Sequence, residues 1–390
     1  MSVLPDIPAA LVESVQRRLA QERSDPTGAA LVRAVRAETG AVVSDAEMLR
    51  LVRGLRRELV GAGPLAELLA DPATTDVVVN GCADVRVDRG RGWEDAGVRF
   101  ADDAAVQRLA RRLATAAGRR LDDAHPFVDA RLPDGTRLHA VLAPVAASGT
   151  SLSLRVLRAR LYDLPALAAA GSLPAVTRAV VEAVVRARLA VLISGGTGSG
   201  KTTLLGALLA AVDPAERLVT VEDAEELRPP HPHLVRLLAR PANVEGAGAI
   251  PLRELVRQAL RMRPDRIVLG EVRGAEVVDM LMALNTGHHG GAGTVHANAA
   301  AEVPARLEAL GALGGLDRTA LHAQLVGAVQ VVVHLSRDLG RRRVSEVAVL
   351  TAGPDGTAVV RSAVVDGRPV EPGASVLAER LRVAGVERPW

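Results

Sequence analysis

Lysine is nearly absent from this chain. Of the 48 basic residues among 390, Lys201 is the only lysine, and all the others are arginine. A solvated surface position tolerates exchange of lysine for arginine, whereas a site that needs a compact ammonium group does not accept a planar guanidinium easily. The single retained lysine therefore indicates a position whose chemistry resists arginine.

Cysteine and aromatic residues are scarce as well. Cys82 is the only cysteine, which excludes an intrachain disulfide and a CxxC zinc site. Two tryptophans, two phenylalanines and one tyrosine are too few for a surface that stacks the bases of single-stranded nucleic acid. The pI of 9.8 comes with a net charge of only +3, smaller than the excess expected of a polyanion-binding surface. We therefore expect no direct contact with nucleic acid.

Long apolar runs are also missing. The most apolar window, residues 175–193, is interrupted by Arg178, Glu182 and Arg186, so no stretch of about 18 residues is suited to span a membrane. The N-terminus lacks the basic-then-apolar pattern of a signal peptide. We expect a cytoplasmic protein whose contact with a membrane is peripheral.

The pattern of apolar residues divides the chain into four regions. Residues 1–60 carry apolar positions at helical spacing and predict small packed helices. Residues 61–165 mix strand-like alternation with one amphipathic helix, which predicts an α/β domain. Residues 173–351 alternate buried strands and helices, the βαβ pattern of a parallel sheet covered on both faces. Residues 352–390 are expected to form a C-terminal strand and a tail.

Later strands are expected at three places near the C-terminus, where antiparallel pairing is one possibility. They are residues 331–335, 344–350 and 357–365.

A glycine-rich loop lies between a buried strand and a helix. Its sequence fits G-x-x-x-x-G-K-[ST], in which backbone N–H groups surround a phosphate, the lysine reaches the β/γ-phosphates and the hydroxyl holds Mg²⁺. The alternative is a flexible Gly/Ser loop with a surface lysine. The residues predicted to bind nucleotide are Gly195, Gly196, Thr197, Gly198, Ser199, Gly200, Lys201, Thr202 and Thr203.

Four further clusters follow the loop. Residues 220–227 are expected to form a strand that runs into acidic residues, and a buried strand expected at 266–269 is followed by Glu271 just past its end, as in a Walker B site. A helix over 252–262 ends in two arginines, and residues 287–297 place histidines around a short strand. Each cluster also has a structural alternative. The acidic residues after the strand could cap a helix, and the arginines could interact with the helix dipole. The paired histidines could have a structural role.

In their joint order these motifs resemble the secretion ATPases of type II and type IV systems and type IV pili. The similarity is greatest to the TadA/CpaF branch of tight-adherence pili, including members associated with conjugal transfer. It covers roughly residues 55 to 350, and the segments at 79–81 and 131–137 are similar too. The resemblance implies an α/β fold with a RecA-like P-loop ATPase domain and a smaller N-terminal α/β domain preceded by helices. It also implies ATP and Mg²⁺ as cofactors, a ring hexamer, and inner-membrane platform proteins as partners.

The resemblance assigns roles to individual residues. Glu226 is expected to orient the attacking water, Glu271 to act as the Walker B acid, and Glu222 to support the site; Thr202, Glu222 and Glu271 are the candidate metal residues. His288 and His296 are expected to sense the γ-phosphate. The phosphate-facing cations implied by the resemblance, some from a neighbouring subunit, are Arg137, Arg155, Arg261 and Arg263.

Two other functions remain open from the sequence. The first is a nucleic-acid motor in conjugal DNA transfer built on the same RecA-like core, which the low net charge and scarce aromatic residues disfavour. The second is a catalytically silent scaffold, which the intact motifs and the retained lysine disfavour.

Overall fold

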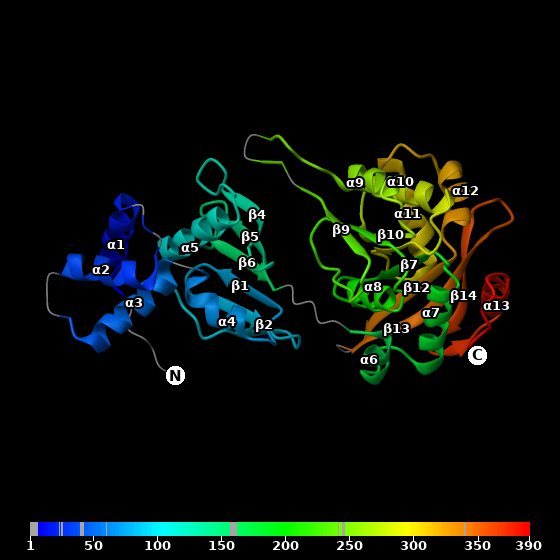
Figure 1. The fold of residues 1–390 in the computed structure, drawn as a ribbon, viewed down its shortest axis with the longest axis horizontal. Coiled ribbons are helices and arrows are strands. Elements are labelled where there is room, and N and C mark those ends of the chain that lie inside the picture. The colour runs from blue at the N-terminus through cyan, green and yellow to red at the C-terminus, as the bar shows by residue number, and fades with distance from the viewer. Residues whose placement is uncertain are drawn as a thin grey trace. The chain divides into compact units, whose positions relative to one another are not determined.

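The computed structural model describes residues 7–22, 24, 26–39, 43–59, 61–156, 162–240, 242–243, 246–338 and 341–390. The chain divides into two compact units, Met1–Arg158 and Ala159–Trp390 (Figure 1). Residues 1–6, on which the expectation about a signal peptide depends, lie outside the described residues.

The first unit begins with three amphipathic helices. They are α1 (Ala9–Gln21), α2 (Gly28–Thr39) and α3 (Asp45–Leu59). Their apolar faces meet around Val15, Leu31 and Leu55, which are fully buried. Burial of apolar side chains at helical spacing is what holds such short helices together.

A six-stranded antiparallel sheet follows, in the order β3-β2-β1-β6-β5-β4. Apolar and polar residues alternate along its strands, so that Val77, Val79, Leu152 and Leu154 enter the core. The Asp102 side chain caps α5, whose apolar face contributes to this core. The elements are η1 (Gly63–Leu65), α4 (Ala66–Ala70), β1 (Asp76–Asn80), β2 (Asp84–Asp88), β3 (Trp93–Asp95), α5 (Asp103–Ala116), β4 (Phe127–Arg131), β5 (Arg137–Val141) and β6 (Ser151–Arg155).

The second unit is built on a nine-stranded sheet in the order β15-β14-β13-β12-β7-β11-β10-β8-β9. The strands from β12 to β9 pair in parallel, whereas β12 to β15 pair antiparallel. The strands are β7 (Val191–Gly195), β8 (Leu218–Glu222), β9 (Leu234–Leu238), β10 (Arg266–Val272), β11 (Ala292–Val295), β12 (Val331–Asp338), β13 (Arg341–Ala352), β14 (Ala358–Val365) and β15 (Arg368–Pro369).

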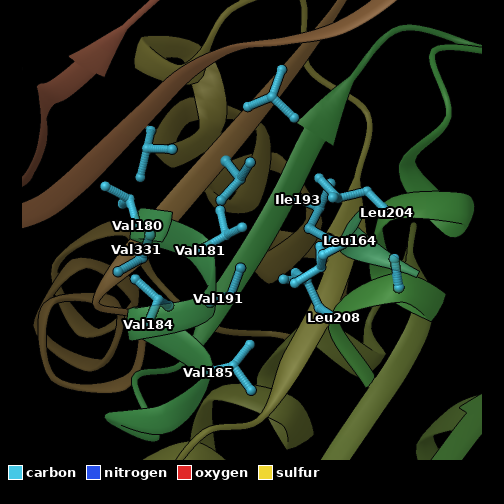
Figure 2. Packing of buried hydrophobic residues seen from close by; sticks show 14 of the residues in the cluster. Leu164, Val180, Val181, Val184, Val185, Val191, Ile193, Leu204, Leu208 and Val331 are labelled. Atoms are coloured by element: carbon cyan, nitrogen blue, oxygen red, sulfur yellow. The ribbon is translucent and has the colours of Figure 1, made fainter. Parts of the chain in front are cut away.

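Helices cover both faces of this sheet. On one face, Val191 and Ile193 of β7 pack with side chains from α6, α7, α8 and β12 (Figure 2). On the other face, Leu192 packs with the helices α9 to α12, which gather on one side of the sheet in Figure 1. The helices are α6 (Leu164–Ala169), α7 (Ala175–Arg186), α8 (Lys201–Ala210), α9 (Leu252–Leu260), α10 (Glu276–Asn285), η2 (Ala300–Glu302), α11 (Val303–Leu313), α12 (Arg318–Ala328) and α13 (Gly373–Val383).

The later strands pair antiparallel, β12 with β13 and β13 with β14, while β12 also pairs in parallel with β7. The expectation of a tail needs correction. The expected tail contains the helix α13, whose Leu377 and Leu381 are fully buried. Pro372 precedes this helix instead of interrupting it, because the N-terminal end of a helix needs no donor from that residue.

The parallel arrangement decides where the loops lie. The carboxyl ends of β7, β8, β10 and β11 meet at one edge of the sheet, and their amino ends meet at the opposite edge. Ligand sites of such sheets form at the carboxyl edge. Among the described residues, no helix is long and apolar enough to cross a membrane.

Candidate functional site

The glycine-rich loop connects β7 to α8 at the carboxyl edge of the sheet. Gly195 has a φ of 153°, and a Cβ there would lie 2.6 Å from the Ser199 Oγ and 2.7 Å from the Leu335 carbonyl oxygen. Gly200, with a φ of 100°, is the N-cap of α8. Any residue with a side chain would be strained at both positions. The loop therefore curls tightly and leads its backbone N–H groups into a helix N-terminus, where an anion is favoured.

Lys201 is the first residue of α8, directly after this loop, and is only 7% exposed. Its Nζ donates to the carbonyl oxygens of Gly195 and Gly196, both at 2.9 Å, and lies 3.4 Å from the His296 Nδ1. Burial lowers the pKa of the ammonium group, and the carboxylates of Glu271 and Glu226 oppose that effect. The structure therefore does not agree with the alternative of a surface lysine on a flexible loop.

Glu226 reaches the loop from a different part of the chain. The Thr202 hydroxyl donates to the Glu226 Oε2 at 3.3 Å. No helix begins in residues 223–233, all of which the structure describes, so the alternative of a helix cap does not apply. The Glu226 carboxylate thus lies beside the hydroxyl expected to hold Mg²⁺.

Glu222 organises the segment that carries Glu226. It ends β8, and its Oε1 accepts from the backbone N–H groups of Glu226 at 3.1 Å and Leu227 at 3.0 Å. Burial raises the pKa of this carboxyl to about 7. A Cβ at Gly270 would lie 2.7 Å from the Glu222 Cγ, so the neighbouring strand needs glycine there to make room.

Glu271, expected just past its strand, is the second-last residue of β10, and it meets His296, which directly follows β11. The His296 Nε2 lies 3.5 Å from the Glu271 Oε1, while its Nδ1 faces Lys201. Burial and the Lys201 charge lower the pKa of His296, whereas Glu271 raises it. The structure therefore brings the lysine, a histidine and two glutamates around one loop.

Three candidate residues lie away from this cluster. Arg261 and Arg263 follow α9 and precede β10, and His288 precedes β11, which places all three at the opposite edge of the sheet. Both arginines are exposed, and the His288 Nδ1 bonds to the Ala283 carbonyl at the end of α10 at 3.1 Å. Within one subunit these residues do not join Lys201, and their predicted roles stay predictions.

Arg137 and Arg155 belong to the first unit. They lie opposite each other on the neighbouring strands β5 and β6. The Arg155 Nε also pairs with Asp76 at 2.9 Å. Their proximity to each other is clear, and their role toward phosphate stays a prediction.

His334 is a residue of this region that sequence reasoning missed. Its Nδ1 lies 2.9 Å from the Ser194 Oγ on β7, both side chains are buried, and a second bond reaches the backbone of Asn298. Burial lowers the pKa of His334. A lone histidine inside the apolar run Val331–Leu335 was the available signal, since buried polar groups need partners.

The residues present fit a nucleotide with Mg²⁺. The tight glycine turn, the helix N-terminus and the Lys201 ammonium suit a polyphosphate, and the Thr202 hydroxyl with the nearby carboxylates of Glu226 and Glu271 offers the oxygen ligands that Mg²⁺ prefers. Among the described residues, no group of three or more His, Cys, Asp or Glu forms a metal cage. Mg²⁺ that is held by one or two protein oxygens together with phosphates needs no such cage.

Comparisons with known proteins concern the family of the whole chain. A sequence profile of the family described as type II/IV secretion system protein matches residues 58–370. A Mycobacterium tuberculosis protein whose name refers to conjugal transfer is 63% identical over 316 residues, which are 79% of this chain and 90% of that protein. Conjugal transfer protein TrbB of Rhizobium radiobacter is 32% identical over 303 residues, which are 76% of this chain and 90% of TrbB.

Among solved structures, that of the pilus retraction motor PilT with bound ADP shares the fold. It has a TM-score of 0.51 at 19% identity and covers 82% of this chain and 87% of PilT. The profile match and the identity to whole relatives together show that the chain belongs to the type II/IV secretion system protein family, a family of secretion ATPases.

Proposed function

We propose that this chain is a Mg²⁺-dependent ATPase that drives a type IV secretion or tight-adherence pilus assembly system. In this proposal it works as a ring hexamer at the cytoplasmic face of the membrane, against inner-membrane platform proteins. The observation that carries the proposal is that three separate parts of the chain meet at the glycine-rich loop, residues 195–200, called the phosphate loop below. They contribute Lys201 with Thr202, Glu226, and His296. A silent scaffold has no need of this arrangement.

Each residue has a task that its position supports. Lys201 and the loop amides hold the phosphates, and the Thr202 hydroxyl, with Glu271 nearby, holds Mg²⁺, which neutralises developing charge on the phosphates. Glu226 orients the attacking water, and Glu222 holds the main chain of Glu226 in place. His296 lies between Lys201 and Glu271, so it can respond to the group bound there.

The experiment that tests the proposal measures ATP hydrolysis and thermal melting of the full chain and two loop variants. Lys201→Ala should abolish hydrolysis with little change in melting temperature, because it removes no apolar core. Lys201→Arg keeps the charge but should be nearly inactive too, because a guanidinium does not fit between the Gly195 and Gly196 carbonyls.

As a matched control, Arg382→Ala removes one exposed cation on α13 and should hydrolyse ATP at the normal rate. Normal turnover by Lys201→Ala would refute the site. Dependence on Mg²⁺ is checked by chelation and by return of the metal.

A nucleic-acid motor is the second candidate, because the names of two relatives refer to conjugal transfer. Salt-sensitive stimulation of hydrolysis by DNA would favour it. Hydrolysis unaffected by DNA would support the secretion or pilus motor.

A further inference from the structure

Two arginines beside the phosphate loop have no part in the site described so far. Arg337 lies near the end of β12 and Arg342 near the start of β13, and the two face each other directly in the register of this hairpin. A Cβ at Gly198 would lie 3.6 Å from an Nη1 of Arg337, and one at Gly200 would lie 3.6 Å from the Cδ of Arg342. Both side chains therefore lie beside the loop that precedes Lys201.

Strand alternation explains why both arginines point to the loop. Leu335 and Val344, two residues before Arg337 and two after Arg342, are buried in the core that also contains Leu204 of α8. Side chains two apart on a strand share a face. Arg337 and Arg342 thus continue the α8 face of the hairpin past the end of its apolar core.

The charges of this hairpin are distributed unevenly. Arg343, on the other face, pairs with Asp338 at 3.3 Å and with Asp366 at 2.5 Å. Arg337 and Arg342 are both exposed, and neither makes an ion pair with any of the residues that the structure describes. Like charges directly opposite each other on neighbouring strands are unfavourable. An anion bound between the two guanidinium groups attracts both of them and offsets the repulsion between them.

We propose that Arg337 and Arg342 form a guanidinium pair that binds the polyphosphate of the nucleotide on the loop. The inference rests on the proposed function, since it needs a nucleotide there. Lys201 alone supplies one ammonium to the loop, and the arginine pair adds two planar donors suited to phosphate oxygens. Because the arginines contact the bound nucleotide itself and not only the transition state of hydrolysis, they should strengthen the binding of ADP as well as of ATP.

The test measures binding of ADP and of inorganic tripolyphosphate, the latter by displacement of a fluorescent ADP analogue, with Mg²⁺ present. Arg337→Gln and Arg342→Gln should each weaken both ligands by about tenfold, as expected for charge-assisted hydrogen bonds, and the double variant should weaken them further. Added salt should weaken binding less in the double variant than in the natural protein.

Arg341→Gln is the matched control. It removes the same charge from the same hairpin at the neighbouring position, which faces away from the loop, and should bind both ligands within about twofold of the natural protein. Melting curves test whether the variants fold, as is expected for exposed positions.

The outcomes separate this inference from the proposed function. If Lys201→Ala loses ADP binding while the double variant binds ADP and tripolyphosphate normally, the arginine pair has no such role and the site itself stands. If the double variant loses ADP but keeps tripolyphosphate, the arginines contact the base or sugar, and the inference is overturned. If the natural protein binds neither ligand, the proposed function fails and the inference fails with it.

Discussion

Glu222 shows how one residue can couple the phosphate site to the stability of the protein. Its side chain is 3% exposed, one carboxylate oxygen accepts two backbone N–H groups, and the other has no partner among the described residues. Burial disfavours the charged form, which is why the pKa of this carboxyl rises from 4.5 to about 7. The folded protein therefore binds a proton here more tightly than the unfolded chain does.

This pKa shift predicts a stability that depends on pH. Since the folded pKa is the higher one, the stabilisation by the bound proton is complete below about pH 4.5 and is lost as the pH rises to about 7. Glu222→Gln has no charge to bury. We expect its free energy of unfolding, relative to the natural protein, to grow by roughly 3 kcal/mol across this window and to level off above it.

Urea unfolding at a series of pH values, in chelator and without nucleotide, measures this difference. Glu254→Gln removes an exposed carboxylate of α9 and serves as control, with no such trend expected. A constant difference between Glu222→Gln and the natural protein from pH 5 to pH 8 would contradict the explanation by burial.

At the scale of elements, β12 and α13 complete the second unit. The parallel pairing of β12 with β7 brings His334 against Ser194, directly before the phosphate loop. Helix α13 packs on β14 through Leu377 and Leu381 and closes the α8 face of the sheet. The phosphate loop is thus held by strands and helices that come more than a hundred residues later in the chain.

Because one face of α13 is buried, shortening a leucine side chain on that face should destabilise the second unit. Leu377→Ala should lower the free energy of unfolding of the second unit by about 2–5 kcal/mol, because it leaves a cavity in a core where Leu377 is fully buried. Val383→Ala, at a position 74% exposed on the same helix, should change it by less than about 0.5 kcal/mol. Chemical denaturation of the two variants provides the comparison. Equal effects would mean that α13 does not pack as described.

At the scale of the whole molecule, the position of the candidate arginines has a consequence. Arg261 and Arg263 lie at the edge of the sheet opposite the phosphate loop, so they cannot serve the loop of their own sheet. We propose that they act on the site of a neighbouring subunit in a ring. An arginine supplied in trans is worth roughly 10³–10⁵ in rate in other NTPases.

Mixed rings test this proposal. Arg263→Asn, chosen because the φ of 52° at Arg263 suits asparagine, and Glu226→Gln should each be nearly inactive alone. When the two variants are mixed, a Glu226→Gln subunit can lend its intact arginine to the otherwise complete site of an Arg263→Asn neighbour. We expect partial recovery of ATP hydrolysis once subunit exchange is established.

The control mixture is Glu226→Gln with Lys201→Ala. Both changes damage the loop side of the site, so no pairing of these subunits restores a complete one, and no recovery is expected. Absence of recovery with Arg263→Asn despite exchange would place Arg263 in a structural role. The same experiment at Arg261 would then decide between the two arginines.

Local sequence was enough to predict most elements of this protein and the position of its glycine-rich loop. Apolar residues at period two and period 3.6 predicted most strands and helices, and the loop motif with the only lysine predicted the strand–loop–helix turn at Lys201. These features depend on interactions between residues close in the chain, so their signal is local. The C-terminal helix α13 was missed because proline and glycine, here Pro372 and Gly373, usually interrupt a helix. Proline is nevertheless well tolerated where a helix starts.

The assembly of the site was decided only by the tertiary structure. Pairing of distant strands placed Glu226 at Thr202, His296 between Lys201 and Glu271, and Arg337 with Arg342 beside the loop. The same pairing placed His288 and the two arginines after α9 at the far edge, which their order in the sequence did not reveal. Which edge of a sheet a residue reaches depends on strand direction and neighbour order, and these are set by burial of both sheet faces across the whole chain.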